Sequence, residues 1–314
     1  MTARAETVAA PASRIVSRRS AYALLLLVIG LWGANWPIMK VGLQYMPPLT
    51  FAATRIVLGG LVLFAVNAFT GRLRLPSRND WRIVISVGTM QMGGFMMSVT
   101  SGLQYVPAGR SSILAYTTSL WVVPLAALFL RERMPPMKLG GFVLGITGVA
   151  VMFNPLGFDW SDPDILLGNG LLMLGALLWA IQIVQVRGHH WEGSPLTLAP
   201  WQFTVAALIL VPAALATESQ SGIDWSPTLD VILLYNGPIA TAFCFWAVLT
   251  FTRALPAITT SLATLGVPVT GVLLSALFLS EPLTVTNTTG LAAILAGVAL
   301  VSLADRRSAV RGAQ

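Results

Sequence analysis

Polar and aromatic side chains that can bind a small solute share one face of the first apolar segment. Trp32, Asn35, Trp36 and Met39 follow the i, i+3, i+4, i+7 spacing of a helix. An amide among apolar residues needs a hydrogen-bond partner, which is either a neighbouring helix or a bound solute. Pro37 leaves a backbone carbonyl near Asn35 without its helical donor. The pattern is typical of a neutral binding surface lined by aromatic rings.

Further neutral polar and aromatic residues lie in the other apolar segments. A methionine-rich run from Met90 to Met97 suits either an adaptable pocket or simple core packing. The segment 230–254 places Asn236, Ile239, Phe243 and Trp246 on one broad helical face. Together with hydroxyl-bearing residues, such groups can hold a zwitterion without a fixed charge. The predicted cavity-lining residues are Trp32, Asn35, Trp36, Gln91, Met97, Tyr116, Trp179, Gln182, Asn236, Phe243 and Trp246.

Arg55 carries the one charge that falls inside an apolar segment, and it has two possible roles. Its guanidinium can bind a substrate carboxylate through paired donors. It also lies close enough to the outer end of its segment to reach the interface and act as an anchor. Prolines within the segments mark candidate hinges, with static kinks as the alternative. The hinge candidates are Pro37, Pro124, Pro238 and Pro268.

Several kinds of chemistry are excluded or disfavoured. The apolar segments contain no Asp or Glu away from their ends, which argues against carboxylate-driven antiport and against strongly cationic substrates. The single cysteine, Cys244, permits neither a disulfide nor a cysteine metal site. His189 and His190 lie in a loop and are expected to be solvated rather than metal-bound. We therefore expect no enzyme activity, no metal and no cofactor.

The elements that position these residues must be transmembrane helices. The 314 residues are 55% hydrophobic and only 10% charged, the mean hydropathy is +0.76, and a soluble domain carries about 25% charged residues. The apolar blocks are long enough to cross a bilayer as helices and lack the alternation of barrel strands. The fold class is thus an all-α polytopic membrane protein with ten transmembrane helices. The predicted spans are 21–43, 48–70, 81–104, 109–130, 137–154, 165–187, 195–216, 230–254, 256–279 and 284–304.

The basic residues predict the orientation in the membrane. With the N-terminus inside, every Lys and Arg except Lys40, Arg55 and Arg110 falls in an inner segment. This explains the net charge of +7 without a nucleic-acid partner. We interpret residues 1–20 as a cytoplasmic tail rather than a cleaved signal, because the apolar run continues past any cleavage site. Both termini are expected in the cytoplasm. Acidic residues mark the outer side, namely Asp159, Asp162, Asp164, Glu218, Asp224, Asp230 and Glu281.

The two halves of the chain repeat each other at a shift of 147 to 149 residues. The matched pairs include Trp32 and Trp179, Pro48 and Pro195, Pro107 and Pro256, Glu132 and Glu281, Gly141 and Gly290, and Gly148 and Gly297. Five spans in each half is an odd number, so the halves must have opposite orientations, as in secondary transporters. The predicted organisation is a first repeat at 21–154, a second at 165–304 and a C-terminal cytoplasmic tail at 305–314.

These residues resemble the EamA family of the drug/metabolite transporter superfamily. The first unit opens with GLWGANWPIMKVGLQYMPPLTFAATR and closes with PAGRSSIL, ALFLRERM and GITGVAVMF. The second opening, ALLWAIQIVQVR, departs from the pattern after its Trp. Within the family the chain is most similar to the YddG-type amino-acid exporters. The resemblance implies that helices 1–4 and 6–9 surround a central cavity and that helices 5 and 10 support them from outside.

The expected function is export of neutral, preferably aromatic or hydrophobic, amino acids by alternating access and uniport. The expected location is the bacterial inner membrane, with a small-molecule substrate, membrane lipid as surroundings and a monomeric state. Small polar amino acids, purines and lipophilic amines are alternative substrates in the same fold. A sensor or assembly subunit that transports nothing is an alternative of another class, although the repeat argues against it.

Overall fold

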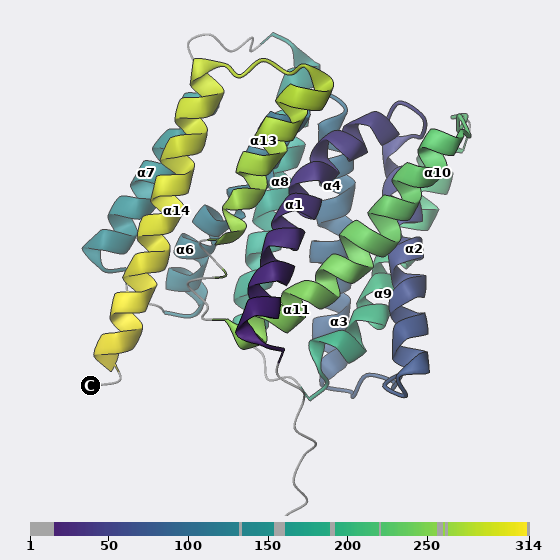
Figure 1. Ribbon diagram of the computed structural model, residues 1–314, viewed down its shortest axis with the longest axis horizontal. Helices are drawn as coiled ribbons and strands as arrows, with labels where there is room; N and C mark the ends of the chain where they lie inside the picture. Colours follow the sequence, from purple (N-terminus) through teal and green to yellow (C-terminus); the bar gives the residue numbers. More distant parts are fainter. Residues whose placement is uncertain are drawn as a thin grey trace, which may run out of the picture.

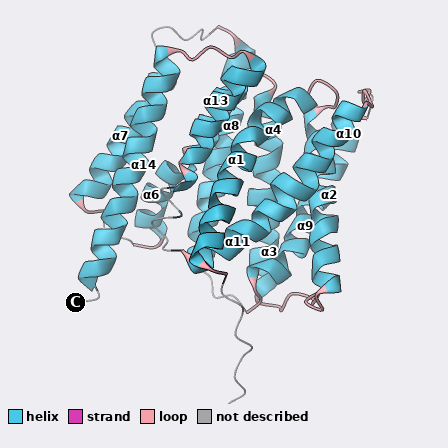
Figure 2. Ribbon diagram, viewed as in Figure 1, coloured by secondary structure: helices cyan, strands magenta, loops and turns pink. Residues whose placement is uncertain are grey.

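The computed structural model describes residues 16–131, 134–153, 161–188, 192–219, 221–255, 260 and 263–312. Every regular element in this part of the chain is a helix (Figure 2). The elements are α1 (Arg18–Gly42), α2 (Pro48–Phe69), α3 (Asp80–Ser86), η1 (Val87–Gly94), α4 (Phe95–Leu103), α5 (Ala108–Tyr116), α6 (Thr118–Phe129), α7 (Pro136–Phe153), α8 (Pro163–Arg187), α9 (Pro195–Glu218), α10 (Pro227–Leu234), η2 (Tyr235–Phe243), α11 (Cys244–Ala254), α13 (Gly266–Leu279) and α14 (Val285–Gly312).

Local sequence explains where several helices begin. α2, α8, α9 and α10 each have proline in the first turn, where the missing N–H removes no helical hydrogen bond. The side chains of Ser17, Asp162, Ser194 and Ser226 accept hydrogen bonds from the first turns of α1, α8, α9 and α10. These caps place the helix starts close to the turn signals in the sequence.

Eight helical segments of the described residues are long and apolar enough to cross a membrane. Two further apolar helices, Pro136–Val151 in α7 and α13, are shorter. The predicted span 256–279 begins at positions outside the described residues. The helical class of the fold is therefore confirmed, while the count of ten spans remains a prediction.

The helices other than α7 and α14 pack in a closed circuit. Its order is α13, α1, α10–η2–α11, α2, α9, α3–η1–α4, α8 and α5–α6, which returns to α13. Figure 1 shows α2, α9 and α10 at one side of the bundle and α7 with α14 at the other. Around the circuit, elements of the first and second sequence repeat alternate at every step.

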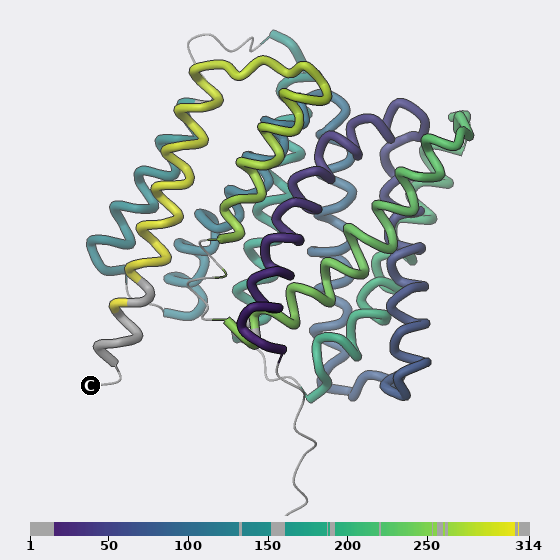
Figure 3. The backbone as a smooth tube through the Cα atoms, in the orientation of Figure 1, coloured from purple at the N-terminus to yellow at the C-terminus, as the bar shows by residue number. Residues whose placement is uncertain are grey.

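α7 and α14 lie side by side in Figure 3 and approach each other very closely. A Cβ on Gly141 would lie 2.7 Å from the carbonyl oxygen of Gly297, and a Cβ on Gly148 would lie 2.8 Å from that of Gly290. These contacts make the two helices antiparallel. Since Gly141 matches Gly290 and Gly148 matches Gly297 in the repeat, the equivalent residues exchange partners across the contact.

Two segments inside the bundle are π-helical, η1 and η2. η2 starts at Tyr235, 148 residues after η1 starts at Val87, so they occupy equivalent positions in the two repeats. η2 packs on α2 and η1 packs on α9, the equivalent helix of the other repeat. π-helical turns are rare and occur frequently at functional sites. Their recurrence directs attention to the residues around them.

The glycine contact predicts opposite behaviour for two adjacent residues. Gly141→Ala should lower the free energy of unfolding by about 1–3 kcal/mol, because its methyl group meets the α14 backbone. Gly140→Ala should be neutral or slightly stabilising, since no atom lies within 4 Å of its Cβ position. The buried thiol of Cys244 permits the measurement, by reaction with a fluorogenic maleimide during heating. Equal unfolding temperatures for the two variants would contradict the contact.

Candidate functional site

Arg55 is held inside the bundle rather than at its surface. Only 5% of the residue is exposed. Its Nε donates a 2.8 Å hydrogen bond to the hydroxyl of Thr241 in η2, and its Nη1 lies 3.0 Å from the sulfur of Met39 in α1. The side chain therefore joins α2 to α1 and to a π-helical turn of the second repeat. The outward anchor considered from the sequence is not the arrangement found.

Among the described residues, the side chains that contact Arg55 carry no opposite charge. Within the described part of the chain its hydrogen-bond partners are Thr241 and Met39, and both are neutral. The hydroxyl of Tyr235 and the thiol of Cys244 lie within electrostatic range of the guanidinium. The Tyr116 hydroxyl lies within the same range of Cys244. A buried charge normally requires a counter-charge, so this position suits an anionic group supplied by a ligand.

The aromatic face of α1 lies against η2. Trp32 Nε1 donates a 2.9 Å hydrogen bond to the carbonyl of Ala240, and the Tyr235 hydroxyl donates to the carbonyl of Leu31. Asn35 in α1 and Asn236 in η2 are both buried. The Oδ1 atom of each has no hydrogen-bond partner among the described residues. Two amide oxygens thus remain able to accept hydrogen bonds beside the helix that carries Arg55.

A similar arrangement recurs in the other half of the molecule. Trp179 of α8 packs edge-on against Phe95, with 4.4 Å between the ring centroids. Gln182 is 0% exposed, and neither its Oε1 nor its Nε2 has a partner among the described residues. Gln91 lies in η1 and is partly buried. The place of Arg55 is taken by Gln202, which is buried in α9. One half therefore offers a cation and the other only neutral groups.

The remaining predicted lining residues differ from one another in how deeply they are buried. Trp36 is buried, and Met97 and Tyr116 pack partly buried against the same hydrophobic core. Phe243 and Trp246 are in ring contact, with centroids 5.7 Å apart. Trp246 is 39% exposed, whereas Asn236 is fully buried. α-Helical spacing does not apply across the π-helical turns of η2, so the common face of residues 236–246 stays a prediction.

The breaks in helical structure do not lie at the predicted prolines. α6 continues through Pro124, and α13 continues through Pro268. The predicted span 109–130 is instead interrupted at Thr117, between α5 and α6, and α13 is preceded by a turn at Leu265. Pro37 lies within α1 and Pro238 within η2. Whether any of these prolines acts as a hinge stays a prediction.

A set of carboxylate side chains bonds to backbone amides of the opposite repeat, a role that the spacing of the residues does not indicate. Glu218 of α9 accepts hydrogen bonds from the Leu49 and Thr50 amides at the start of α2, at 2.9 and 2.7 Å. Glu281 accepts from the first two amides of α5, at 2.6 and 2.8 Å. Asp80 accepts from the Glu192 and Gly193 amides before α9. From the sequence, Glu218 and Glu281 were interpreted only as markers of the outer side, and Asp80 was given no role.

One signal in the sequence could have indicated the Glu281 cap. The repeat preserves the acid, Glu132 and Glu281, and the helix start, Pro107 and Pro256, while the basic neighbours of Glu132 are lost. An acid that is present in both repeats, although its neighbours differ, is a candidate partner for a helix start that is also present in both repeats. Only the second copy, Glu281, lies within the described residues.

Metal binding has no support in the described residues, which contain no group of three or more His, Cys, Asp or Glu side chains arranged to hold an ion. His189 and His190 lie outside the described residues. The residues around Arg55 are neutral amides, hydroxyls and aromatic rings. Such a donor set suits reversible binding of a small organic solute.

The fold and the repeated central arrangement define a membrane transporter. The chain belongs to the EamA-like transporter family, whose sequence pattern matches residues 19–154 and again residues 166–303. The predicted resemblance to the EamA family is thereby confirmed.

Individual relatives cover nearly the whole chain. The uncharacterized transporter YvbV of Bacillus subtilis is 32% identical over 90% of this chain and 92% of its own length. A probable amino-acid metabolite efflux pump of Escherichia coli is 28% identical over 88% of this chain and 92% of its own. One solved crystal structure, 23% identical with a TM-score of 0.65, covers 93% of this chain and 99% of its own, and shows the fold alone.

The unpartnered amide of Gln182 predicts a gain in stability on its removal. Gln182→Leu should raise the free energy of unfolding by about 1 kcal/mol, because it removes a buried polar group that makes no hydrogen bond to the described residues. Asn67→Leu should lower it by about 1–3 kcal/mol, since the Asn67 amide donates to the carbonyls of Leu63 and Leu196. Thermal unfolding followed at the Cys244 thiol measures both. Destabilisation by Gln182→Leu would reveal a structural partner instead.

Proposed function

We propose that this protein exports neutral amino acids, preferably those with aromatic or hydrophobic side chains, by alternating access and without a coupled ion. The observation that carries the proposal is the buried guanidinium of Arg55, which has only neutral partners in the described residues. An amino-acid carboxylate is the charge that would complete this environment. Arginine binds a carboxylate through two parallel hydrogen bonds.

The groups around Arg55 complement the rest of a zwitterion. The unpartnered oxygens of Asn35 and Asn236 accept hydrogen bonds and suit the substrate ammonium. Trp32 supplies an aromatic surface, and Met39 supplies a polarisable one, for the substrate side chain. None of these groups carries a negative charge, so a strongly cationic solute gains no counter-charge here. Selection for neutral amino acids follows from this composition.

Relatives support the substrate class. The Escherichia coli relative is named a probable amino-acid metabolite efflux pump, and a Salmonella typhimurium relative, 28% identical over 90% of this chain, carries the same name. The preference for aromatic side chains rests on the rings near Arg55.

We further propose ten membrane spans in two inverted repeats, 21–154 and 165–304. The antiparallel contact of α7 and α14 supports this organisation, because equivalent glycines exchange partners as a two-fold axis requires. α2 and α9 are also bonded to each other in both directions, the end of one helix to the start of the other. The amide of Asn67 near the end of α2 bonds to Leu196 at the start of α9, and Glu218 at the end of α9 bonds to Leu49 at the start of α2.

The conformation is proposed to be closed at the end of the bundle where α2 and α5 begin. There Glu218 caps α2, Glu281 caps α5, and Lys40 Nζ donates to the carbonyls of Gln104 and Val106 at 2.9 and 3.1 Å. The two carboxylates each join one repeat to the other, and Lys40 joins α1 to the segment that precedes α5. Export requires these contacts to separate when the opposite end closes.

The closed end is proposed to face outward. Arg72, Arg74, Arg78 and Arg82 follow α2 at the opposite end, which the positive-inside rule assigns to the cytoplasm. Both termini are proposed to lie at that cytoplasmic side of the bacterial inner membrane. A monomer contains the whole proposed substrate site.

Counterflow in proteoliposomes tests the substrate and the role of Arg55. Vesicles loaded with unlabelled phenylalanine should accumulate labelled phenylalanine transiently without an ion gradient. Arg55→Gln should lower the initial rate at least tenfold, which corresponds to about 1.4 kcal/mol of lost binding. Arg72→Gln, which removes an exposed arginine, is the matched control and should transport normally.

Two outcomes would contradict the proposal in different ways. Absence of counterflow in the unaltered protein would remove phenylalanine as substrate or uniport as mechanism, and other metabolites would then be tested with a proton gradient. Equal rates for Arg55→Gln and Arg72→Gln would remove Arg55 from the site. Phenethylamine, which lacks the carboxylate, should compete poorly with phenylalanine in the unaltered protein.

Labelling of single introduced cysteines tests the orientation. Ser221→Cys should react with a membrane-impermeant maleimide in intact spheroplasts, because Ser221 is exposed at the proposed outer end. Arg72→Cys, exposed at the other end, should react only after the membrane is permeabilised. Cys244 is buried and adds little background. The reverse pattern would invert the proposed topology.

A further inference from the structure

The hydroxyl of Thr241 makes an uncommon contact for a threonine inside a helix. Such a hydroxyl often donates to the carbonyl one turn earlier in its own helix, as those of Thr100 and Thr270 do at 2.8 Å. In the described part of the chain the Thr241 hydroxyl has one hydrogen-bond partner, the Nε of Arg55. The hydroxyl therefore serves the buried arginine of the other repeat rather than its own helix.

Close packing of η2 on α2 fixes the place of this hydroxyl. Gly59 follows Arg55 by four residues, so both lie on the same face of α2. A Cβ on Gly59 would lie 2.8 Å from Thr241 Cγ2 and 3.2 Å from Thr241 Cβ. The Thr241 side chain is thus held between a glycine and the guanidinium of one helix face, with little room to rotate.

The sequence repeat links the presence of this hydroxyl to the presence of the charge. Gly93 of η1 precedes Thr241 by 148 residues, the shift that also relates the starts of η1 and η2. In that half Gln202 stands in place of Arg55. The half with the cation has the hydroxyl, and the half with the neutral amide has glycine.

Contacts of Gly93 show that packing alone does not require a threonine here. Ala206 of α9 is the residue equivalent to Gly59, at a shift of 147. A Cβ on Gly93 would lie 3.8 Å from the Ala206 Cα, so the equivalent elements meet at the same place in the other half. They do so there without a hydroxyl.

The contact with Thr241 decides which donors of Arg55 remain for a ligand. A guanidinium has five N–H groups. Thr241 accepts from Nε, and Met39 accepts from Nη1. The N–H groups that are left, on Nη1 and Nη2, make no other hydrogen bond to the described residues. A carboxylate can bind this pair of nitrogens through two parallel hydrogen bonds.

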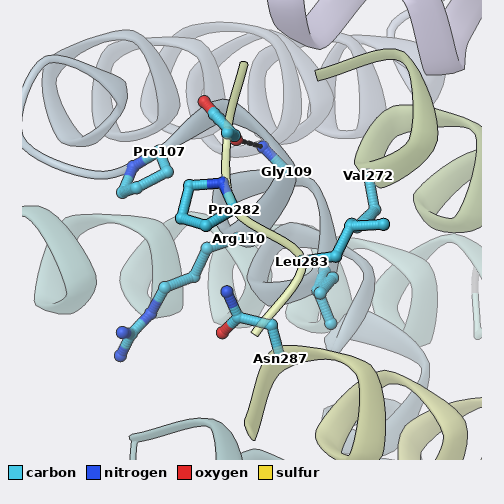
Figure 4. Close-up of a pocket in the computed structure, with 9 residues that line it drawn as sticks. Pro107, Gly109, Arg110, Val272, Pro282, Leu283 and Asn287 are labelled. Atoms are coloured by element: carbon cyan, nitrogen blue, oxygen red, sulfur yellow. Dashed lines mark hydrogen bonds between the residues drawn. The ribbon is translucent and has the colours of Figure 1, made fainter. Parts of the chain in front are cut away.

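Arg110 shows the opposite situation. It lines a small pocket that Glu281 also lines (Figure 4), so the protein itself places a carboxylate in that pocket. The two side chains bonded to Arg55 are neutral. Of these two arginines, Arg55 is the one that suits the carboxylate of a ligand.

We propose that Thr241 is a positioning residue of the substrate site, whose hydroxyl holds Nε so that Nη1 and Nη2 of Arg55 face the substrate carboxylate. This role rests on the proposed binding of an amino acid at Arg55. The hydroxyl orders the long arginine side chain before the substrate arrives, which lowers the entropy lost on binding. Its removal should therefore weaken binding rather than slow the movement between conformations.

Phenylalanine counterflow with three variants tests this role. Thr241→Val removes the hydroxyl at nearly constant volume and should raise KM about fivefold with little change in Vmax. Thr241→Ser keeps the hydroxyl and should retain the KM of the unaltered protein. Thr100→Val is the matched control, because Thr100 is buried and bonds to its own helix, and its KM should not change. Size-exclusion chromatography verifies that each variant is folded.

Two further measurements separate positioning from a change of pocket shape. Inhibition by phenethylamine, which lacks the carboxylate, should be equal in Thr241→Val and in the unaltered protein. In an Arg55→Gln background, Thr241→Val should raise KM no further, because the hydroxyl acts through the guanidinium. Weaker inhibition by phenethylamine, or the same fivefold rise without Arg55, would overturn the role of Thr241.

Failure of this role and failure of the proposed function give different results. Equal KM in Thr241→Val and the unaltered protein would remove Thr241 as a positioning residue and leave amino-acid export in place. Absence of counterflow in the unaltered protein would overturn both, since no substrate carboxylate would then bind at Arg55.

Discussion

The requirement that every backbone donor and acceptor in the hydrocarbon region find a partner inside the protein underlies this structure. Regular helices satisfy it everywhere except at their ends and irregular turns. At three ends the missing partner comes from the other half of the chain: Glu218 serves the start of α2, Glu281 serves the start of α5, and Asp80 serves the segment before α9. The repeats are therefore joined by the same hydrogen bonds that permit their helices to begin.

The two π-helical segments follow from the same requirement. They break regular helical geometry inside the membrane, where this is tolerated only in contact with protein or a polar cavity. Both pack tightly on the second helix of the opposite repeat. A Cβ at Gly59 would lie 2.8 Å from Thr241 Cγ2, and one at Gly88 would lie 2.7 Å from the Gln202 carbonyl. Ala240 in η2 accepts from Trp32. Irregular backbone, aromatic rings and buried amides thus meet at equivalent places in both halves.

The halves are alike in backbone and unlike in chemistry. Arg55 and its counterpart Gln202 occupy equivalent positions, and both are buried. Only the first carries a charge, so the first half would hold the substrate carboxylate, while the second half provides neutral groups such as Asn236. Symmetric architecture allows two opposite conformations of similar energy. Asymmetric side chains allow a directional fit to one solute. The peripheral pair α7 and α14, packed through glycines, supports this circuit without contributing to the proposed site.

The sequence by itself determined the helical membrane class, the repeat, the family and the neutral character of the central residues, because hydropathy, turn residues and charge are local properties. It also placed Asn35 and Gln182 at equivalent positions. Only the tertiary structure decided that Arg55 points inward to Thr241 and that Trp246 is separated from Asn236 by π-helical turns. It also revealed Glu218 and Glu281 as caps. The Arg55 contact and the two caps depend on partners more than a hundred residues away in the sequence. The separation of Trp246 from Asn236 depends on a local change of helical period. Residue spacing reveals neither kind of feature.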